Sequence, residues 1–149
     1  MKIDDYLIVQ QGKNWPRLLR DWMPPLPPQF TIWLVNRLGD VFAMTPTGAV
    51  LRLDIGSGTC TEVATSQQHF ATQLNAPEAA NLWLRIELVD ACRRAGMTLG
   101  PQECYGFRIP PTLGGVYEVS NLKPTPLAVH YSYQSYICRQ RDVYWVPPA

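Results

Sequence analysis

The chain has 149 residues, of which 46% are hydrophobic and 17% are charged, a composition that indicates a single folded domain over residues 1–149. Thirteen basic and twelve acidic residues leave a formal charge of +1. Nucleic-acid binders usually carry a basic patch or a high pI, and a membrane span needs roughly 20 consecutive apolar residues. Because the sequence shows neither, we expect no nucleic-acid partner and no membrane partner.

Two further features indicate a soluble cytoplasmic protein. Residues 1–6 contain two acids and no long apolar segment, so they do not resemble a secretory signal. The four cysteines, Cys60, Cys92, Cys104 and Cys138, are widely spaced and form no CxxC pair. In a chain without a signal they are most simply reduced thiols, some of them buried.

Proline is unusually frequent, with 14 residues, ten of which lie in clusters at 24–28, 110–111, 124–126 and 147–148. Such clusters punctuate a chain, because proline seldom lies inside central strands or helices. The cluster at 24–28 could also be a polyproline II ligand for an aromatic groove. Its place between two apolar segments favours a rigid connection.

The first half of the chain predicts a short helix followed by an antiparallel meander. Asn14 is placed to cap a helix with Pro16 in its first turn. From residue 30 the helical spacing gives way to short, mainly apolar segments, which predict four strands, and glycine-containing turns separate them. The expected strands are 31–35, 40–44, 49–54 and 61–64. Short connections between strands favour antiparallel pairing.

The second half predicts mainly helices. Ser66 is placed to cap a helix over 67–74, and Pro77 opens the longest predicted helix, which ends at Gly96. An apolar stripe on that helix is expected to face the sheet. The stripe consists of Leu82, Trp83, Ile86, Val89 and Cys92.

Two more strands are expected at 104–107 and 116–119. Residues 129–140 have apolar residues at helical spacing, although their tyrosines would also suit a strand, and we favour a helix. The predicted fold class is α+β, with an antiparallel meander packed against one long and several short helices.

No catalytic residue, metal site or cofactor is predicted. Cys104 and His130 occur in the chain order of a papain-like dyad, but Cys104 lies in an aromatic strand without nucleophile-specific neighbours. A buried structural cysteine is the simpler interpretation. A zinc site commonly needs closely paired ligands, and the two histidines, His69 and His130, lie far apart.

Two glycine-rich segments could cradle an anion through backbone N–H groups. They are Gly56-Ser57-Gly58-Thr59 and Leu113-Gly114-Gly115. Neither has the Lys-Ser/Thr ending of a nucleotide-binding loop, so we interpret both as turns. A small molecule held near these turns remains an alternative.

The aromatic segment near the C-terminus has the composition of a protein-interaction hot spot. Tyr131, Tyr133, Tyr136 and Arg139 are the predicted partner-binding residues. Tyrosine and arginine can also stack on bases, and some of the rings could instead cover the sheet. A helical or alternating stripe must place some of them outward.

Several of these segments resemble a known bacterial family. They are Gly39-Asp40-Val41-Phe42, Gly48 to Asp54, Gln102 to Phe107, Leu113 to Tyr117, and Asn121. The chain resembles the C-terminal domain of immunity proteins paired with type VI secretion DNase toxins, over approximately residues 5–140. The resemblance implies a cytoplasmic, non-enzymatic α+β protein that binds a toxin and blocks its active site or its assembly. Because the shared motifs are turns and core positions, they transfer no toxin-contact residue.

The charge pattern bears on how such a protein would inhibit a nuclease. A phosphate mimic needs clustered carboxylates, whereas acids are scattered along this chain, as at Asp21, Asp40, Asp54, Glu62, Glu87, Asp90 and Glu103. Inhibition by shape and aromatic anchors is therefore favoured. The leading function is stoichiometric neutralisation of a cognate secreted toxin. The alternatives are a regulatory or small-molecule-binding module and, less favoured, a cysteine hydrolase.

Overall fold

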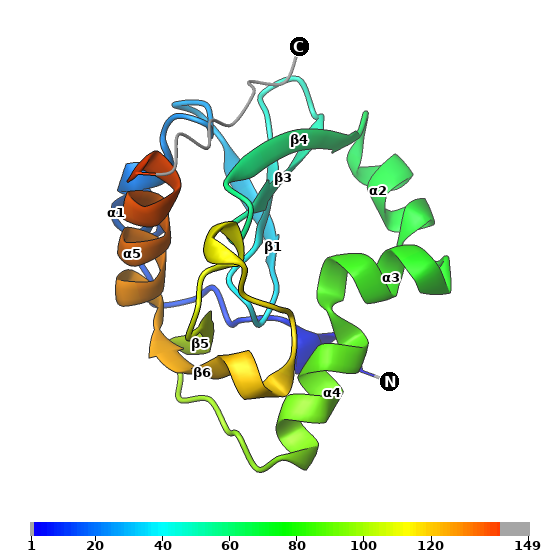
Figure 1. Cartoon of the computed structure of the whole chain (residues 1–149). Helices are drawn as coiled ribbons and strands as arrows, with labels where there is room; N and C mark the ends of the chain where they lie inside the picture. Colours follow the sequence, from blue (N-terminus) through cyan, green and yellow to red (C-terminus); the bar gives the residue numbers. More distant parts are fainter. Residues whose placement is uncertain (1, 141–149) are drawn as a thin grey trace.

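The computed structural model describes residues 2–140, and its centre is a four-stranded antiparallel sheet in the order β1-β2-β3-β4 (Figure 1). The strands are β1 (Thr31–Val35), β2 (Val41–Met44), β3 (Val50–Asp54) and β4 (Thr59–Ala64). This confirms the predicted meander, with strand ends that differ by at most two residues. Short apolar segments and glycine turns were sufficient signals because both act locally.

Both faces of this sheet are buried. In β2, Val41 and Ala43 belong to one core cluster, whereas Phe42 belongs to another. Side chains of neighbouring residues in a strand point to opposite faces, so the two clusters lie on opposite sides of the sheet. The domain therefore has three layers, with helices on each side of the sheet (Figure 1).

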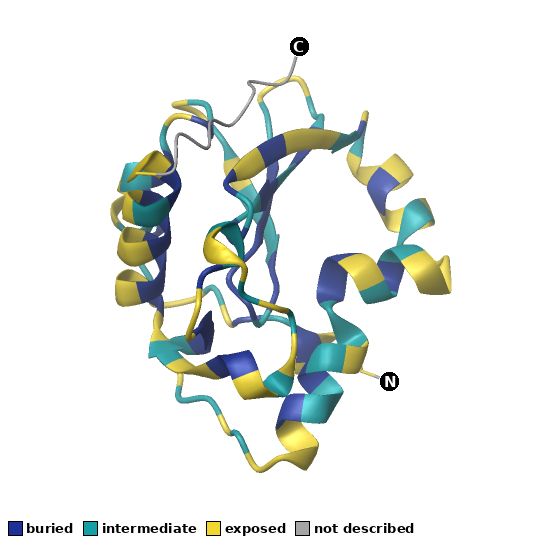
Figure 2. Ribbon diagram, in the orientation of Figure 1, coloured by how far each residue is buried: buried dark blue, intermediate teal, exposed yellow. Residues whose placement is uncertain are grey.

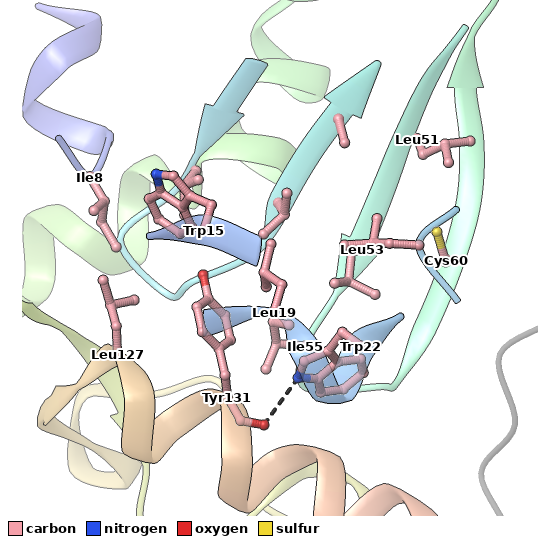
Figure 3. Packing of buried hydrophobic residues seen from close by; sticks show 14 of the residues in the cluster. Ile8, Trp15, Leu19, Trp22, Leu51, Leu53, Ile55, Cys60, Leu127 and Tyr131 are labelled. Carbon is pink, nitrogen blue, oxygen red and sulfur yellow. Dashed lines mark hydrogen bonds between the residues drawn. The ribbon is translucent and has the colours of Figure 1, made fainter. Parts of the chain in front are cut away.

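The first face is covered by the N-terminal segment and by the last helix. These elements are α1 (Trp15–Leu18), η2 (Arg20–Trp22) and α5 (Leu127–Gln140). η1 (Ile3–Tyr6) precedes them and packs elsewhere, since Tyr6 belongs to the cluster that contains Val89 and Cys92. The Asn14 side chain accepts a hydrogen bond from the backbone N–H of Arg17 at 3.1 Å, which confirms the predicted cap. Figure 3 shows Leu19 and Trp22 between Tyr131 of α5 and the sheet residue Leu53.

The second face is covered by α2 (Gln67–Gln73) and α3 (Pro77–Leu84). Phe70 stacks on Trp83 with ring centroids 4.9 Å apart, and Phe42 of the sheet lies 5.3 Å from Phe70. The Ser66 hydroxyl accepts a hydrogen bond from the N–H of His69, as predicted for the cap of this helix. An aromatic cluster thus fixes α2 and α3 against the sheet.

The prediction of one helix from Pro77 to Gly96 is wrong. The helix breaks at Arg85, whose φ of 54° is left-handed, and α4 (Ile86–Arg94) follows. In a continuous helix the carbonyl of Trp83 would accept from the N–H of Glu87. Here Asn36 donates to that carbonyl at 2.9 Å, and the Glu87 N–H donates to the side chain of Asn81. Tertiary partners replace the helical bond at this point.

A second, two-stranded sheet pairs β5 (Glu103–Phe107) with β6 (Leu122–Pro126). The strand predicted at 104–107 is confirmed, whereas the one predicted at 116–119 is wrong. That region leads into η4 (Val119–Asn121), and β6 begins after η4. Pro124 and Pro126 fit into β6 because it pairs with β5 alone in this sheet.

The segment between β5 and β6 is organised by one buried asparagine. It contains η3 (Pro111–Leu113). The Asn121 amide donates to the carbonyls of Ile109 and Val116 and accepts from the N–H of Ile109, each at 2.9 Å. The loop is therefore held in a defined shape beside the end of the main sheet.

The α+β fold class is confirmed. α5 has 14 residues and is the longest helix among residues 2–140, which confirms the helix favoured near the C-terminus. In the same described part of the chain, no helix combines the length and apolar character needed to cross a membrane.

Candidate partner-binding surfaces

α5 has one buried face and one exposed face (Figure 2). The buried face consists of Leu127, His130, Tyr131, Gln134, Ser135 and Cys138. On the other face, Val129, Tyr133 and Tyr136 are 55%, 45% and 58% exposed. Their spacing of four and three residues places them on one side of the helix. This face, Val129/Tyr133/Tyr136, is called the α5 aromatic face below.

Tyr131 does not fit the expectation that it contacts a partner. Its ring is fully buried, its hydroxyl donates to the carbonyl of Gly39 at 2.8 Å, and its own carbonyl accepts from the indole N–H of Trp22 (Figure 3). Burial raises the pKa of its phenol well above the ordinary value. Helical spacing decides this outcome, because Tyr131 follows Leu127 on the core side of α5.

Arg139 lies in the last turn of α5, where its guanidinium donates to the carbonyl of Asp21 at 2.6 Å. The side chain is exposed. Beside it, a cleft of about 290 Å³ lies between the 12–21 segment and α5. The cleft is lined by three basic residues, Lys13, Arg17 and Arg20, and one acid, Asp21. The cleft between the 12–21 segment and α5 is therefore basic.

A groove of about 610 Å³ lies between α3, α4 and the segment leading into η4. Its apolar lining is Leu82, Leu88, Ala91, Tyr117 and Val119, and its polar lining is Glu78, Asn81, Arg85, Glu87 and Glu118. The Arg85 guanidinium lies over the Tyr117 ring, 4.2 Å from its centroid. This set is called the α3–α4 groove. Sequence reasoning missed it because its residues come from three separate segments.

The turn between β1 and β2 holds the domain together rather than forming a site. The Asn36 amide donates to the Asp40 carboxylate at 3.0 Å, and the other Asp40 oxygen accepts from the N–H of Ile55. His130 contacts the carbonyl of Leu38 through Nε2 at 3.0 Å. These buried groups find partners within the chain, as a structural network requires.

Cys104 and His130 are both buried. Burial raises the pKa of the Cys104 thiol and lowers the pKa of His130 to about 4, so both groups favour their neutral forms. A thiol protease needs the opposite, a thiolate beside an imidazolium. Among residues 2–140, no three His, Cys, Asp or Glu side chains are grouped so that they could hold a metal ion.

The glycine turns pack against protein atoms. A Cβ on Gly56 would collide with the Tyr117 hydroxyl and approach Pro111, and a Cβ on Gly115 would collide with the carbonyl of Ile109. Both glycines therefore permit close contacts within the chain. This packing gives the small-molecule alternative no support at the two turns.

Residues 64–136 match the family model described as T6SS immunity protein Tdi1, C-terminal. This segment is therefore similar to that family. The resemblance predicted from the sequence, to a type VI secretion immunity domain, is thereby confirmed. A search of curated proteins found no match.

The immunity-family segment contains α2, α3, α4, β5, β6 and α5 as far as Tyr136. It therefore includes the whole α3–α4 groove and the α5 aromatic face. Arg139 and the basic lining of the cleft beside α5 lie outside it. Beyond this segment, the expected extent of the resemblance over residues 5–140 stays a prediction.

Proposed function

We propose that this chain is an immunity protein that neutralises a cognate secreted bacterial toxin by forming a stoichiometric complex with it in the cytoplasm. The proposal treats residues 1–149 as one domain. It is supported by the immunity-family match and by the exposure of Tyr133 and Tyr136 inside the matched segment. The exposed tyrosine pair on α5 is the observation that carries it.

The chemistry of the α5 aromatic face suits protein binding. A tyrosine buries a large ring and offers a hydroxyl, so an exposed pair on a rigid helix provides contact area at a low entropic cost. Arg139 stands one turn along the helix from Ser135 and Tyr136 and completes the proposed contact set. Tyr131 is left out of this set because it is buried.

We propose that the protein acts by occupying or covering a functional surface of the toxin and not by catalysis. The buried, neutral states of Cys104 and His130 support a non-enzymatic role. A nuclease is the toxin class that the resemblance implies, and the toxin partner is proposed to be the product of the adjacent gene.

The test is co-expression of the chain with the product of the adjacent gene in a host that this product kills. We expect survival and a complex of fixed stoichiometry by size-exclusion chromatography with light scattering. Y133A and Y136A should each weaken binding by about tenfold, as hot-spot tyrosines do. Y131F is the control for a buried tyrosine of the same helix, and its binding is measured after thermal denaturation has shown that it is folded.

Two results would contradict the proposal at different levels. If the folded chain gives neither rescue nor a complex, toxin neutralisation is wrong for this gene pair. If the complex forms and both tyrosine variants bind with unchanged affinity, the toxin is bound through another surface.

A further inference from the structure

We propose that the α3–α4 groove is a second docking surface, which takes a basic segment of the toxin that carries an apolar side chain between Lys or Arg residues. This inference rests on the toxin-binding function proposed above. It concerns a part of the molecule distinct from α5, which lies on the other side of the main sheet (Figure 1).

The shape of the groove follows from the break between α3 and α4. Leu82 is 50% exposed, although its neighbours Trp83 and Leu84 are buried. A straight helix would have carried Leu82 on the predicted core stripe. With the break at Arg85, Leu82 instead lines an open groove together with Leu88 and Val119. The floor can therefore accept one apolar side chain of a partner.

The charge of the groove selects the partner. Three exposed carboxylates, Glu78, Glu87 and Glu118, line it, and Arg85 is the single basic residue in the lining. The Arg85 guanidinium is already engaged over the Tyr117 ring. The carboxylates thus outnumber the available positive charge, which favours a Lys- or Arg-bearing segment.

The contrast with the cleft beside α5 strengthens this assignment. Lys13, Arg17 and Arg20 line that cleft with a single acid, Asp21. A chain with a formal charge of +1 therefore separates its charges, with an acidic groove at α3–α4 and a basic cleft at α1–α5. Three acids that are distant from one another in the sequence, Glu78, Glu87 and Glu118, thus line one groove. A toxin that binds nucleic acid would present basic residues of the required kind.

The backbone at the groove is also unusual. Arg85 is the one non-glycine residue with positive φ among residues 2–140. Such a conformation costs free energy and persists where surrounding contacts hold it, often at binding surfaces. Here it orients α4 against α3 and so creates the groove.

The test uses the full chain and a catalytically inactivated form of the adjacent gene product. The groove variants are E78Q/E87Q/E118Q and L82A, and E62Q on the exposed part of β4 is the matched control. Dissociation constants are measured by calorimetry at low and high salt, after thermal denaturation has shown that each variant is folded. Hydrogen exchange of residues 78–91 and 117–119 is followed with and without the toxin.

We expect the triple variant to bind about tenfold or more weakly at low salt and to show a smaller salt dependence, and L82A to lose about fivefold. E62Q should bind like the unaltered chain, and the toxin should protect the groove segments from exchange. If the triple variant unfolds, the groove assignment is tested with L82A, with the three single Gln variants and with the exchange data.

Unchanged affinity of the groove variants, with toxin protection confined to α5, would overturn the groove assignment and leave toxin binding intact. Absence of any binding by the unaltered chain would overturn both proposals.

Discussion

The hydroxyl of Tyr131 donates a hydrogen bond to the carbonyl oxygen of Gly39 over 2.8 Å, between residues 92 positions apart. Gly39 has a φ of +88°, and a Cβ there would lie 3.4 Å from the Tyr131 ring and 3.1 Å from His130. The turn between β1 and β2 thus lies so close to α5 that an added Cβ at Gly39 would be tight against His130. This contact connects the helix that carries the aromatic face to the main sheet.

Removal of the Tyr131 hydroxyl should destabilise the fold. In Y131F the buried carbonyl of Gly39 loses this donor, so the free energy of unfolding should fall by about 1–3 kcal/mol. Y133F, which alters an exposed tyrosine of the same helix, should change it by less than about 0.5 kcal/mol. Urea denaturation measures both. Equal effects of the two changes would contradict the assignment of Tyr131 to the core.

His130 should make the fold sensitive to acid. Its pKa is lowered from 6.5 to about 4 by burial, so the folded state favours the neutral imidazole. The resulting stability is fully present above pH 6.5 and is lost as the pH falls toward 4, by up to about 3 kcal/mol. The difference in unfolding free energy between the unaltered chain and H130Q should therefore shrink over this range.

Urea denaturation at several pH values measures this difference, and the contributions of other groups cancel in it. H69Q, which removes the exposed imidazole of α2, is the control and should keep the acid-induced loss because His130 is still present. Parallel pH curves for H130Q and the unaltered chain would show that His130 does not titrate as argued.

Gly56 should be coupled to Tyr117. An Ala Cβ at position 56 would collide with the Tyr117 hydroxyl and lie 2.9 Å from Pro111, so G56A should cost about 1–3 kcal/mol. Removing the hydroxyl with Y117F should relieve part of that cost. A double-mutant cycle by chemical denaturation should therefore show a favourable coupling of about 0.5 kcal/mol or more.

G100A is a useful control for this cycle, because the nearest atom to its Cβ is the flexible carboxylate end of Glu103, at 3.1 Å. Its cost should be clearly smaller. Additive effects of G56A and Y117F would mean that the loop does not pack on Gly56 as described.

At position 85, replacement by glycine should destabilise the fold less than replacement by alanine. Both changes remove the guanidinium from the Tyr117 ring, but glycine adopts positive φ without a steric penalty. R85G should therefore unfold at a higher urea concentration than R85A, with a difference of about 1 kcal/mol. If R85A is as stable as R85G, the helix break is not held in the left-handed conformation.

Local signals in the sequence were enough for the sheet, the caps and the family. Short apolar segments and turn glycines placed the four strands, and Asn14 and Ser66 marked helix starts, because each acts over a few residues. The family resemblance was confirmed over residues 64–136. The sequence also showed that aromatic residues gather near the C-terminus, although it left open which of them point outward.

Tertiary structure decided the remaining features, because each depends on partners distant in the chain. The break at Arg85 requires Asn36 to take the carbonyl of Trp83, and that contact spans 47 positions. The division of the tyrosines into core and surface required the position of α5 on the sheet. The acidic groove formed because folding places Glu118 beside the helices that carry Glu78 and Glu87. The periodicity of one segment contains no information about contacts between separate segments, since these contacts arise only when the elements pack together.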